Sequence, residues 1–251
     1  MTRPVLILGD SHADALKGAL AAGGGAICAG AEAFRLAKIK NGKPFGDLSL
    51  DKALARVRAL PRDALVICAI GGNQHQSFGL VQHRRRFDFM FPGAPLLEGE
   101  GEIVPFNALR ALFEQSLGRD LNMAQAIREA APGDVLQLSA PPPKADEAFM
   151  LRHLDTMFRD MGVDEIGFSA PALRLKLWRL QLLVSRELYS KIGVELLPNP
   201  PATLTADGFL APDFYGADAT HANAAYGREV LAQIEVRRQQ APTVATQARR
   251  N

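Results

Sequence analysis

The polar residues with the clearest chemical potential stand at three places in the sequence. The first is Gly9-Asp10-Ser11-His12, directly after the apolar run at residues 5–8. A serine at such a strand-to-helix turn exposes its hydroxyl above a sheet, and its backbone N–H lies where the helix dipole stabilises an oxyanion. Ser11 is therefore a candidate nucleophile. A helix cap formed by Ser11 or Asp10 is the alternative interpretation, and capping does not exclude catalysis.

A serine nucleophile also needs a base and a group that stabilises the oxyanion. Asp218-Ala219-Thr220-His221 offers the base, because an aspartate three residues before a histidine can reach its imidazole in a tight turn. The aspartate would then fix the tautomer and stabilise the imidazolium. Asn73, after Gly71-Gly72, can direct its amide N–H to an oxyanion. Taken singly, these two motifs are more often a helix-capping aspartate and a turn asparagine.

Short apolar segments alternate with helical segments along the chain. We expect strands at residues 5–8, 26–29, 64–70, 134–139 and 194–197, and helices at residues 11–22, 51–60, 122–131, 147–161, 171–192 and 223–237. Continuously apolar strands between helices predict an α/β fold, with a mostly parallel five-stranded sheet covered on both faces. Parallel strands end at one edge of the sheet, so the three motifs should meet there. Residues 76–107 break this rhythm, and we expect them to run over the strand ends.

Length and composition favour one globular domain. The chain has 251 residues, of which 47% are hydrophobic and 22% charged, and we place the domain at residues 1–238 and a disordered polar tail at residues 239–251. The net charge of +2 gives no electrostatic reason to expect nucleic acid or a membrane as a partner. No apolar run is long enough for a signal peptide or a bilayer span, so a cytoplasmic protein is expected. Cys28 and Cys68 follow apolar residues and are expected to be buried thiols.

Together the three motifs resemble those of the SGNH (GDSL) hydrolases. Gly9-Asp10-Ser11-His12 is similar to the first block of the family, with His12 where the founding motif has leucine. Gly71-Gly72-Asn73 is similar to the third block, and Asp218-Ala219-Thr220-His221 to the fifth. The resemblance extends from Val5 to about Ile234. It implies a flavodoxin-like three-layer α/β/α fold, hydrolysis of an ester through a serine triad, and no cofactor.

The resemblance also implies a role for each residue. Ser11 would be the nucleophile, His221 the general base and Asp218 the residue that orients it. The oxyanion would bind to the Ser11 N–H, the Asn73 amide and a glycine after the second strand. Gly30 is the nearest glycine for that role, with Gly42 and Gly46 behind it. Gln74 stands where the family usually has aspartate, which we expect to alter local hydrogen bonds only.

The expected substrate is a small acyl ester. The Gly-Asp-Ser-His-Ala form looks like the branch of the family that acts on acylated carbohydrates, so an acetyl group on a carbohydrate is preferred. The residues expected near the substrate are Asp10, His12, Gly72, His75 and Tyr215. His12 either lines the pocket or satisfies the helix start, and His75 either contacts the leaving group or is a solvated turn residue. The sequence does not indicate an oligomeric state.

Two other functions remain open from the sequence. The chain could be a catalytically weak or inactive binding module, with residues 76–107 recognising a ligand, although the phenylalanines of that segment also fit buried packing. It could be a metallophosphoesterase, because Asp10-x-His12 and Gly72-Asn73-Gln74-His75 superficially resemble metal-ligand motifs. Against this second function, the sequence shows no bridging aspartate motif and no late His-x-His pair.

Overall fold

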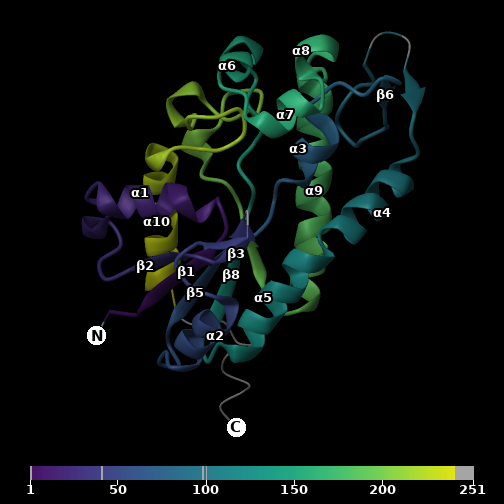
Figure 1. Ribbon diagram of the computed structural model, residues 1–251. Helices are drawn as coiled ribbons and strands as arrows, with labels where there is room; N and C mark the ends of the chain where they lie inside the picture. Colours follow the sequence, from purple (N-terminus) through teal and green to yellow (C-terminus); the bar gives the residue numbers. More distant parts are fainter. Residues whose placement is uncertain (1, 41, 98, 100, 241–251) are drawn as a thin grey trace.

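A parallel sheet of five strands lies at the centre of the computed structural model, which describes residues 2–40, 42–97, 99 and 101–240 (Figure 1). The strands are β1 (Val5–Gly9), β2 (Glu32–Arg35), β5 (Leu65–Ala69), β8 (Asp134–Leu138) and β9 (Glu195–Leu197). Their order across the sheet is β2-β1-β5-β8-β9, and every neighbouring pair is parallel. Counted along the chain this order is 2-1-3-4-5, which is the flavodoxin-like order. The predicted fold is therefore confirmed.

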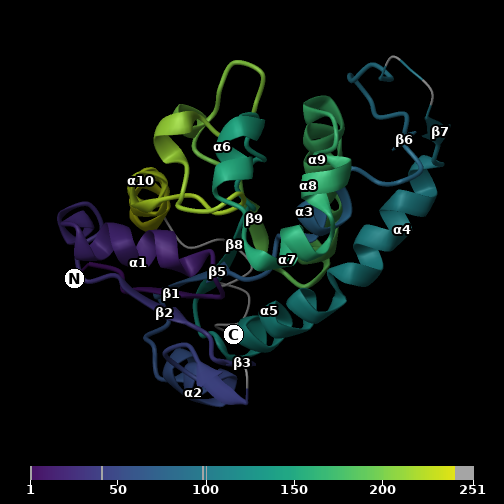
Figure 2. The same ribbon diagram turned by 45° about the horizontal axis from the view of Figure 1, so that its top comes forward.

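Helices cover both faces of the sheet. They are α1 (Ala13–Ala21) and α10 (Ala224–Gln239) on one face, and α2 (Leu50–Arg58) and α5 (Gly118–Ala130) on the other (Figures 1 and 2). Strand side chains alternate between the two faces. In β1, Val5 and Ile7 pack with α1 and α10, whereas Leu6 and Leu8 pack with α2 and α5. Burial on both faces explains why β1 is a continuous apolar run.

The remaining elements lie around this core. The long helix α9 (Pro171–Lys191) packs against α3 (Gln74–Gly79), α4 (Phe106–Ser116) and β9. Three short helices, α6 (Glu147–Arg152), α7 (Thr156–Asp160) and α8 (Val163–Ile166), lie beyond the carboxyl end of the sheet (Figure 1). Two small two-stranded sheets are also present. One pairs β3 (Lys38–Lys40) with β4 (Lys43–Phe45), and the other pairs β6 (Phe87–Asp88) with β7 (Glu102–Ile103). Single 3-10 turns occur at Gly24–Ala26, Pro201–Thr203 and Pro212–Phe214.

The prediction of a second strand at residues 26–29 is wrong. Gly24–Ala26 forms a 3-10 turn, and the second strand is β2, at Glu32–Arg35. The apolar signal at residues 26–29 has another cause, because Cys28 is fully buried against the α1 and α10 side of the core. β2 is an edge strand with half-buried and exposed positions. Its charged ends, Glu32 and Arg35, hide it from a search for apolar runs.

Two predicted helices also differ from the structure. Residues 147–161 form two short helices rather than one, because Asp155 interrupts the run and caps α7 by accepting a hydrogen bond from the Phe158 N–H. The helix predicted at residues 122–131 begins earlier, at Gly118, and α4 before it was not predicted; only its first two residues fall in the irregular segment. The predicted tail contains Gln239, which is the last residue of α10, and otherwise falls largely outside the described residues.

The irregular segment at residues 76–107 forms its own small core with α4 and α9. Phe89 is fully buried there, with Phe87 and Phe91 packed around it. Figure 1 shows β6 on the outer side of α9, away from β1. Leu80 and Val81 pack with α6, α7 and α8, and the described residues from Phe87 onward cover α4 and α9 instead of the strand ends. The phenylalanines of the segment are packing residues.

Two further expectations concern burial and membranes. Cys28 and Cys68 are both free and buried, as predicted. Within the described ranges, no helix is both long and apolar enough to cross a bilayer.

A buried ion pair fastens the irregular segment at residues 76–107 to α9. The Lys176 ammonium group donates to the Asp88 carboxylate and to the backbone carbonyls of Phe89 and Pro95. Both charged side chains are almost fully buried. The Leu97 N–H donates to the second Asp88 oxygen at 2.7 Å. Buried charges of this kind are tolerated only when they are paired and hydrogen-bonded.

We expect Lys176→Met to lower the free energy of unfolding by about 3–5 kcal/mol, because it leaves the Asp88 carboxylate buried without a cation. Lys176→Met combined with Asp88→Asn should recover most of that loss, since the neutral amide carries no charge to desolvate. Urea unfolding measures both. Arg56→Ala is the control, because it removes the exposed pair with Glu32 and should cost less than about 1 kcal/mol. A double variant no more stable than Lys176→Met would contradict this account.

Candidate active site

Ser11 lies in the turn between β1 and α1, where the chain passes closest to β5. A Cβ on Gly9 would lie 2.4 Å from the Ala69 carbonyl oxygen, so only glycine fits there. The Asp10 carboxylate accepts hydrogen bonds from the His12 N–H (3.2 Å) and the Gly71 N–H (2.9 Å). Neither the Ser11 hydroxyl nor its N–H has a hydrogen-bond partner in the described part of the chain, and α1 has no side-chain cap. Asp10 thus holds the turn, and both polar groups of Ser11 are left available.

Asp218 and His221 form the predicted pair in the loop before α10. The His221 Nδ1–H donates to Asp218 Oδ2 at 2.7 Å. The other oxygen, Oδ1, accepts from the backbone N–H groups of Thr220 and His221, each at 2.7 Å. Burial raises the pKa of Asp218, but the bonds from the His221 ring and backbone outweigh it, so the pKa lies well below its usual range. Asp218 is therefore a carboxylate that fixes the His221 tautomer and leaves Nε2 unprotonated.

His221 and Ser11 face the same small cavity. The Nε2 atom of His221 is buried and has no hydrogen-bond partner among the described residues. Both residues line a cavity of about 20 Å³, whose other walls include Leu16, Leu138 and Tyr226. The sequence of β1 places Ser11 there, and the last loop places His221 there. Hydrogen bonds between nucleophile and base are often long in the free enzyme and shorten when substrate binds.

Asn73 lies beyond the end of β5, in contact with His12, the residue after Ser11. It follows Gly71 and Gly72, whose φ angles of 67° and 99° are in the left-handed region that favours glycine. The Asn73 Oδ1 atom lies 2.8 Å from His12 Nε2. No hydrogen bond to Asn73 Nδ2 is found within the described ranges, so this amide N–H₂ can serve as an oxyanion donor.

The third oxyanion donor expected from the sequence is not found where it was placed. Gly30 precedes β2, whose residues run from Glu32 to Arg35 parallel to β1, so Gly30 lies at the amino end of the sheet, away from Ser11. Assigning it to the oxyanion hole was wrong, because the strand before it was misplaced. At the carboxyl end of β2, the Leu36 N–H donates to the Gly9 carbonyl and the Ala37 N–H to the Leu48 carbonyl.

The two glycines before Asn73 have no free N–H either. The Gly71 N–H is bound to Asp10, and the Gly72 N–H donates to Gln74 Oε1 at 3.2 Å. Gln74 also donates to Asp120 Oδ2 at 2.7 Å, so this residue anchors the loop to α5. Of the oxyanion donors expected from the sequence, the Ser11 N–H and the Asn73 amide remain available.

His75 supports the loop and does not contact solvent. It is 2% exposed, so neither a leaving-group contact nor a solvated turn histidine describes it. Its Nδ1 lies 3.0 Å from the Gly72 carbonyl and 3.1 Å from Gln181 Oε1. Both are acceptors, so Nδ1 carries the proton and the buried Nε2 has no partner among the described residues. Burial lowers the pKa of His75 to about 4.

Gln181 on α9 is a supporting residue that the sequence did not indicate. Its amide donates to the Gly72 carbonyl at 2.9 Å, and its oxygen accepts from the His75 N–H at 2.7 Å. Gly72 is therefore held by its own carbonyl and N–H groups, and it does not present either to a substrate. The only signal in the sequence was the glutamine itself, which lies on the buried face of α9.

Tyr215 packs beside the site and is not part of the cavity wall. Its ring lies 5.0 Å from the Phe149 ring, and the Lys144 ammonium nitrogen lies 4.8 Å from the centroid of each. Lys144 is buried and donates to the backbone carbonyls of Gly216 and Asp218. Burial lowers the pKa of Lys144 to about 8, against the opposing effect of Asp218. Lys144, which the sequence did not indicate, thus fixes the loop that carries the Asp218–His221 pair.

The residues that resembled metal-ligand motifs bind other groups in the structure. Asp10 binds backbone N–H groups, and His75 Nδ1 faces the Gly72 carbonyl and Gln181. In the part of the chain that the structure describes, no group of three or more His, Cys, Asp or Glu side chains is placed to hold a metal ion.

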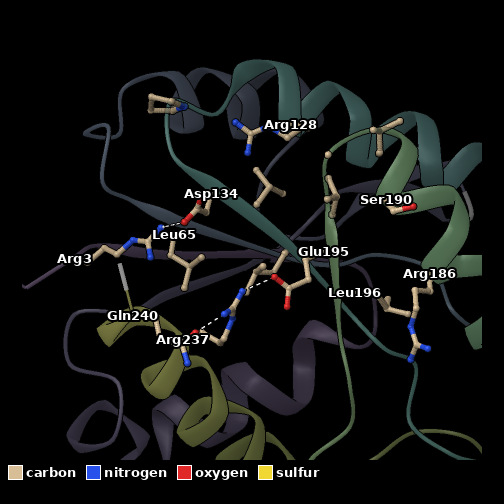
Figure 3. Close-up of a pocket in the computed structure, with 16 residues that line it drawn as sticks. Arg3, Leu65, Arg128, Asp134, Arg186, Ser190, Glu195, Leu196, Arg237 and Gln240 are labelled. Carbon is tan, nitrogen blue, oxygen red and sulfur yellow. Dashed lines mark hydrogen bonds and ion pairs between the residues drawn. The ribbon is translucent and has the colours of Figure 1, made fainter. Parts of the chain in front are cut away.

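A second cavity lies at the amino end of the sheet, opposite the candidate site. It has a volume of about 500 Å³ and is lined at the amino ends of β5, β8 and β9 (Figure 3). Two of its arginines are paired internally, Arg3 with Asp134 and Arg237 with Glu195. No predicted site residue lines this cavity within the described ranges, so it is separate from the candidate active site.

Comparisons with known proteins give structural likeness only. No family model and no curated protein matches the sequence. An extracellular lipase from Streptomyces rimosus is similar at TM-score 0.48 and 17% identity, over 93% of this chain and 99% of that one. A GDSL-like lipase from Bacteroides thetaiotaomicron is similar at TM-score 0.47 and 14% identity, over 94% and 88%. A carbohydrate acetylesterase family member from Sinorhizobium meliloti is similar at TM-score 0.42 and 14% identity, over 93% and 96%.

We expect His75 to make the protein sensitive to acid. Because its pKa is lower in the folded protein than in the unfolded chain, unfolding takes up a proton between pH 6.5 and about 4, and stability falls as the pH is lowered through that window. The expected loss from this group is about 3 kcal/mol at pH 4. His75→Asn keeps a donor at the Nδ1 position but cannot titrate. Urea unfolding of this variant should show a shallower pH dependence below pH 6.5 than the wild type, and identical curves would contradict the assignment.

Proposed function

We propose that this chain is a serine esterase of the SGNH type, which hydrolyses a small acyl ester through Ser11, His221 and Asp218. The observation that carries the proposal is that Ser11 and His221 line one cavity, with the Ser11 hydroxyl and His221 Nε2 unpartnered in the described chain, while Asp218 binds the other ring nitrogen. The order of the motifs along the chain and the position of Ser11 and Asn73 at the switch point between β1 and β5 support it.

The reaction follows from these positions. His221 Nε2 takes the hydroxyl proton as Ser11 Oγ attacks the ester carbonyl, and the carbonyl electron pair moves onto the oxygen. The Ser11 N–H and the Asn73 amide donate to this oxyanion. When the intermediate collapses, the alcohol leaves with the proton from His221. A water molecule, deprotonated by His221, then attacks the acyl-enzyme, and the acid leaves as Ser11 regains its proton.

The size of the cavity favours an acetyl group. A volume of about 20 Å³ is enough for about one water molecule, and hence for a methyl group, without rearrangement of the walls. Leu16, Leu138 and Tyr226 close it with apolar surface. The resemblance of Gly-Asp-Ser-His-Ala to the branch that acts on acylated carbohydrates makes sugar acetates the preferred natural substrates.

We expect Ser11→Ala to lower kcat for p-nitrophenyl acetate by at least about 1,000-fold, because it removes the nucleophile. The initial rate of p-nitrophenol release measures the effect. Ser190→Ala is the matched control, since Ser190 is an exposed serine whose hydroxyl binds the Glu187 carbonyl on α9. Equal rates in the wild type and Ser11→Ala would overturn the triad assignment.

The cavity also predicts a preference for short acyl chains. We expect kcat/KM to fall by about 10-fold or more from p-nitrophenyl acetate to the butyrate, because two further methylene groups exceed the free volume. Leu138→Ala enlarges the cavity at a half-buried position, so it should raise the butyrate-to-acetate ratio. A wild-type enzyme that hydrolyses the butyrate as fast as the acetate would exclude the acetyl-sized pocket while leaving the triad intact.

A further inference from the structure

His12 occupies an unusual position for a histidine near a serine nucleophile. It directly follows Ser11 and precedes α1, and its Nε2 lies 2.8 Å from Asn73 Oδ1. The rings of His12 and His221 are 5.5 Å apart. Its backbone N–H is bound to Asp10. His12 therefore connects the turn that carries the nucleophile with the turn that carries the Asn73 amide.

The hydrogen bond constrains which end of the Asn73 amide faces the site. A side-chain amide has an accepting oxygen at one end and two donating N–H groups at the other, and a half-turn exchanges them. A proton on His12 Nε2 binds the oxygen and leaves Nδ2 on the opposite side. If the amide turned over, its N–H₂ would be directed to His12, and the oxygen would repel a developing oxyanion.

The surroundings of His12 keep it a neutral donor. Burial is the largest effect and lowers its pKa, and the neighbouring His221 ring lowers it further. Asp10, the hydrogen bond with Asn73 and Asp218 act in the opposite direction without reversing the shift. A neutral imidazole has one N–H, and the bond to Asn73 Oδ1 requires that it be on Nε2. No carboxylate binds a His12 ring nitrogen in the described part of the chain, so it lacks the partner that orients a catalytic base.

We propose that His12 is a positioning residue, whose Nε2–H fixes the Asn73 amide with Nδ2 directed to the oxyanion. The inference rests on the proposed esterase function. Its weight comes from the donors that the sequence suggests for the oxyanion: the Gly71 and Gly72 N–H groups are engaged, whereas the Ser11 N–H and the Asn73 side-chain amide have no acceptor among the described residues. Leucine, which stands at this position in the founding motif, cannot donate a hydrogen bond. In this chain the identity of residue 12 therefore determines whether the second oxyanion donor is held in place.

A double-mutant cycle tests this role. We expect His12→Leu to lower kcat for p-nitrophenyl acetate by about 10- to 100-fold with KM within about twofold, and Asn73→Ala to lower it by about 100-fold or more. The double variant should be no slower than Asn73→Ala, because His12 acts through the amide that is already absent. His12→Gln presents an N–H at nearly the same place and should restore kcat to within about threefold of the wild type. His83→Leu, an exposed histidine on the outer segment, is the matched control.

The cycle separates positioning from a general structural role. If His12→Leu lowers kcat by the same factor in the wild type and in the Asn73→Ala background, or if His12→Gln does not recover activity, the inference is wrong. Thermal unfolding of each variant shows whether the protein remains folded at the assay temperature. Should His12→Leu unfold, His12→Gln still shows whether an N–H donor at this place supports the wild-type kcat, and Asn73→Ala still gives the size of the amide's contribution.

A second measurement does not depend on turnover. Nitrogen-15 NMR of the histidine rings should show His12 as the Nε2–H tautomer, with its proton protected from exchange, and Asn73→Ala should remove that protection. If the wild type is inactive on all esters but shows this tautomer, the esterase proposal fails and the His12–Asn73 contact stands. If the wild type shows Ser11-dependent turnover and His12 is the Nδ1–H tautomer, only the inference about His12 fails.

Discussion

The bridge formed by the Asp10 carboxylate is the interaction on which the candidate site depends. It joins the turn after β1 to the turn after β5 by accepting the His12 and Gly71 N–H groups. These two strands are neighbours in the sheet although β2, β3 and β4 lie between them in sequence. Gly9 allows the strands to approach closely enough for one carboxylate to reach both turns. The turns that carry Ser11 and Asn73 are held together by this constraint.

His221, the proposed base, is positioned by a separate set of contacts. Asp218 uses one oxygen for backbone N–H groups and the other for the His221 ring, so the carboxylate shapes the loop and fixes the ring together. Lys144 holds the same loop by donating hydrogen bonds to two of its backbone carbonyls. A buried ammonium group is costly to desolvate, and its lowered pKa reflects that cost. The arrangement therefore gives up some stability to keep the loop in one conformation.

The sequence predicts the parts of this site that are carried by continuously apolar strands. β1 and β5 are buried on both faces, so each is a continuous apolar run. The ends of these runs, and with them Ser11 and Asn73, can therefore be located in the sequence. β2 is an edge strand whose charged ends conceal it, and the misplaced strand led to Gly30. His75 was misjudged and Gln181 was missed because each depends on a partner 106 positions away. Such contacts follow from how α9 packs against α3, which local periodicity does not encode.

Among the buried polar atoms without a partner in the described residues, His221 Nε2 is the one that the proposed acyl transfer would use. Buried polar atoms normally find partners, and leaving one without a partner costs about 1–3 kcal/mol. Around Ser11 the N–H groups of Gly71, Gly72 and Leu36 are all engaged. His221 Nε2 is buried and unpartnered, and in the cavity wall Gln137 Oε1 is the other such atom found among the described residues. In the proposed mechanism, a His221 Nε2 that has no donor in the free protein costs stability but reduces the reorganisation needed when a hydroxyl or a water molecule arrives.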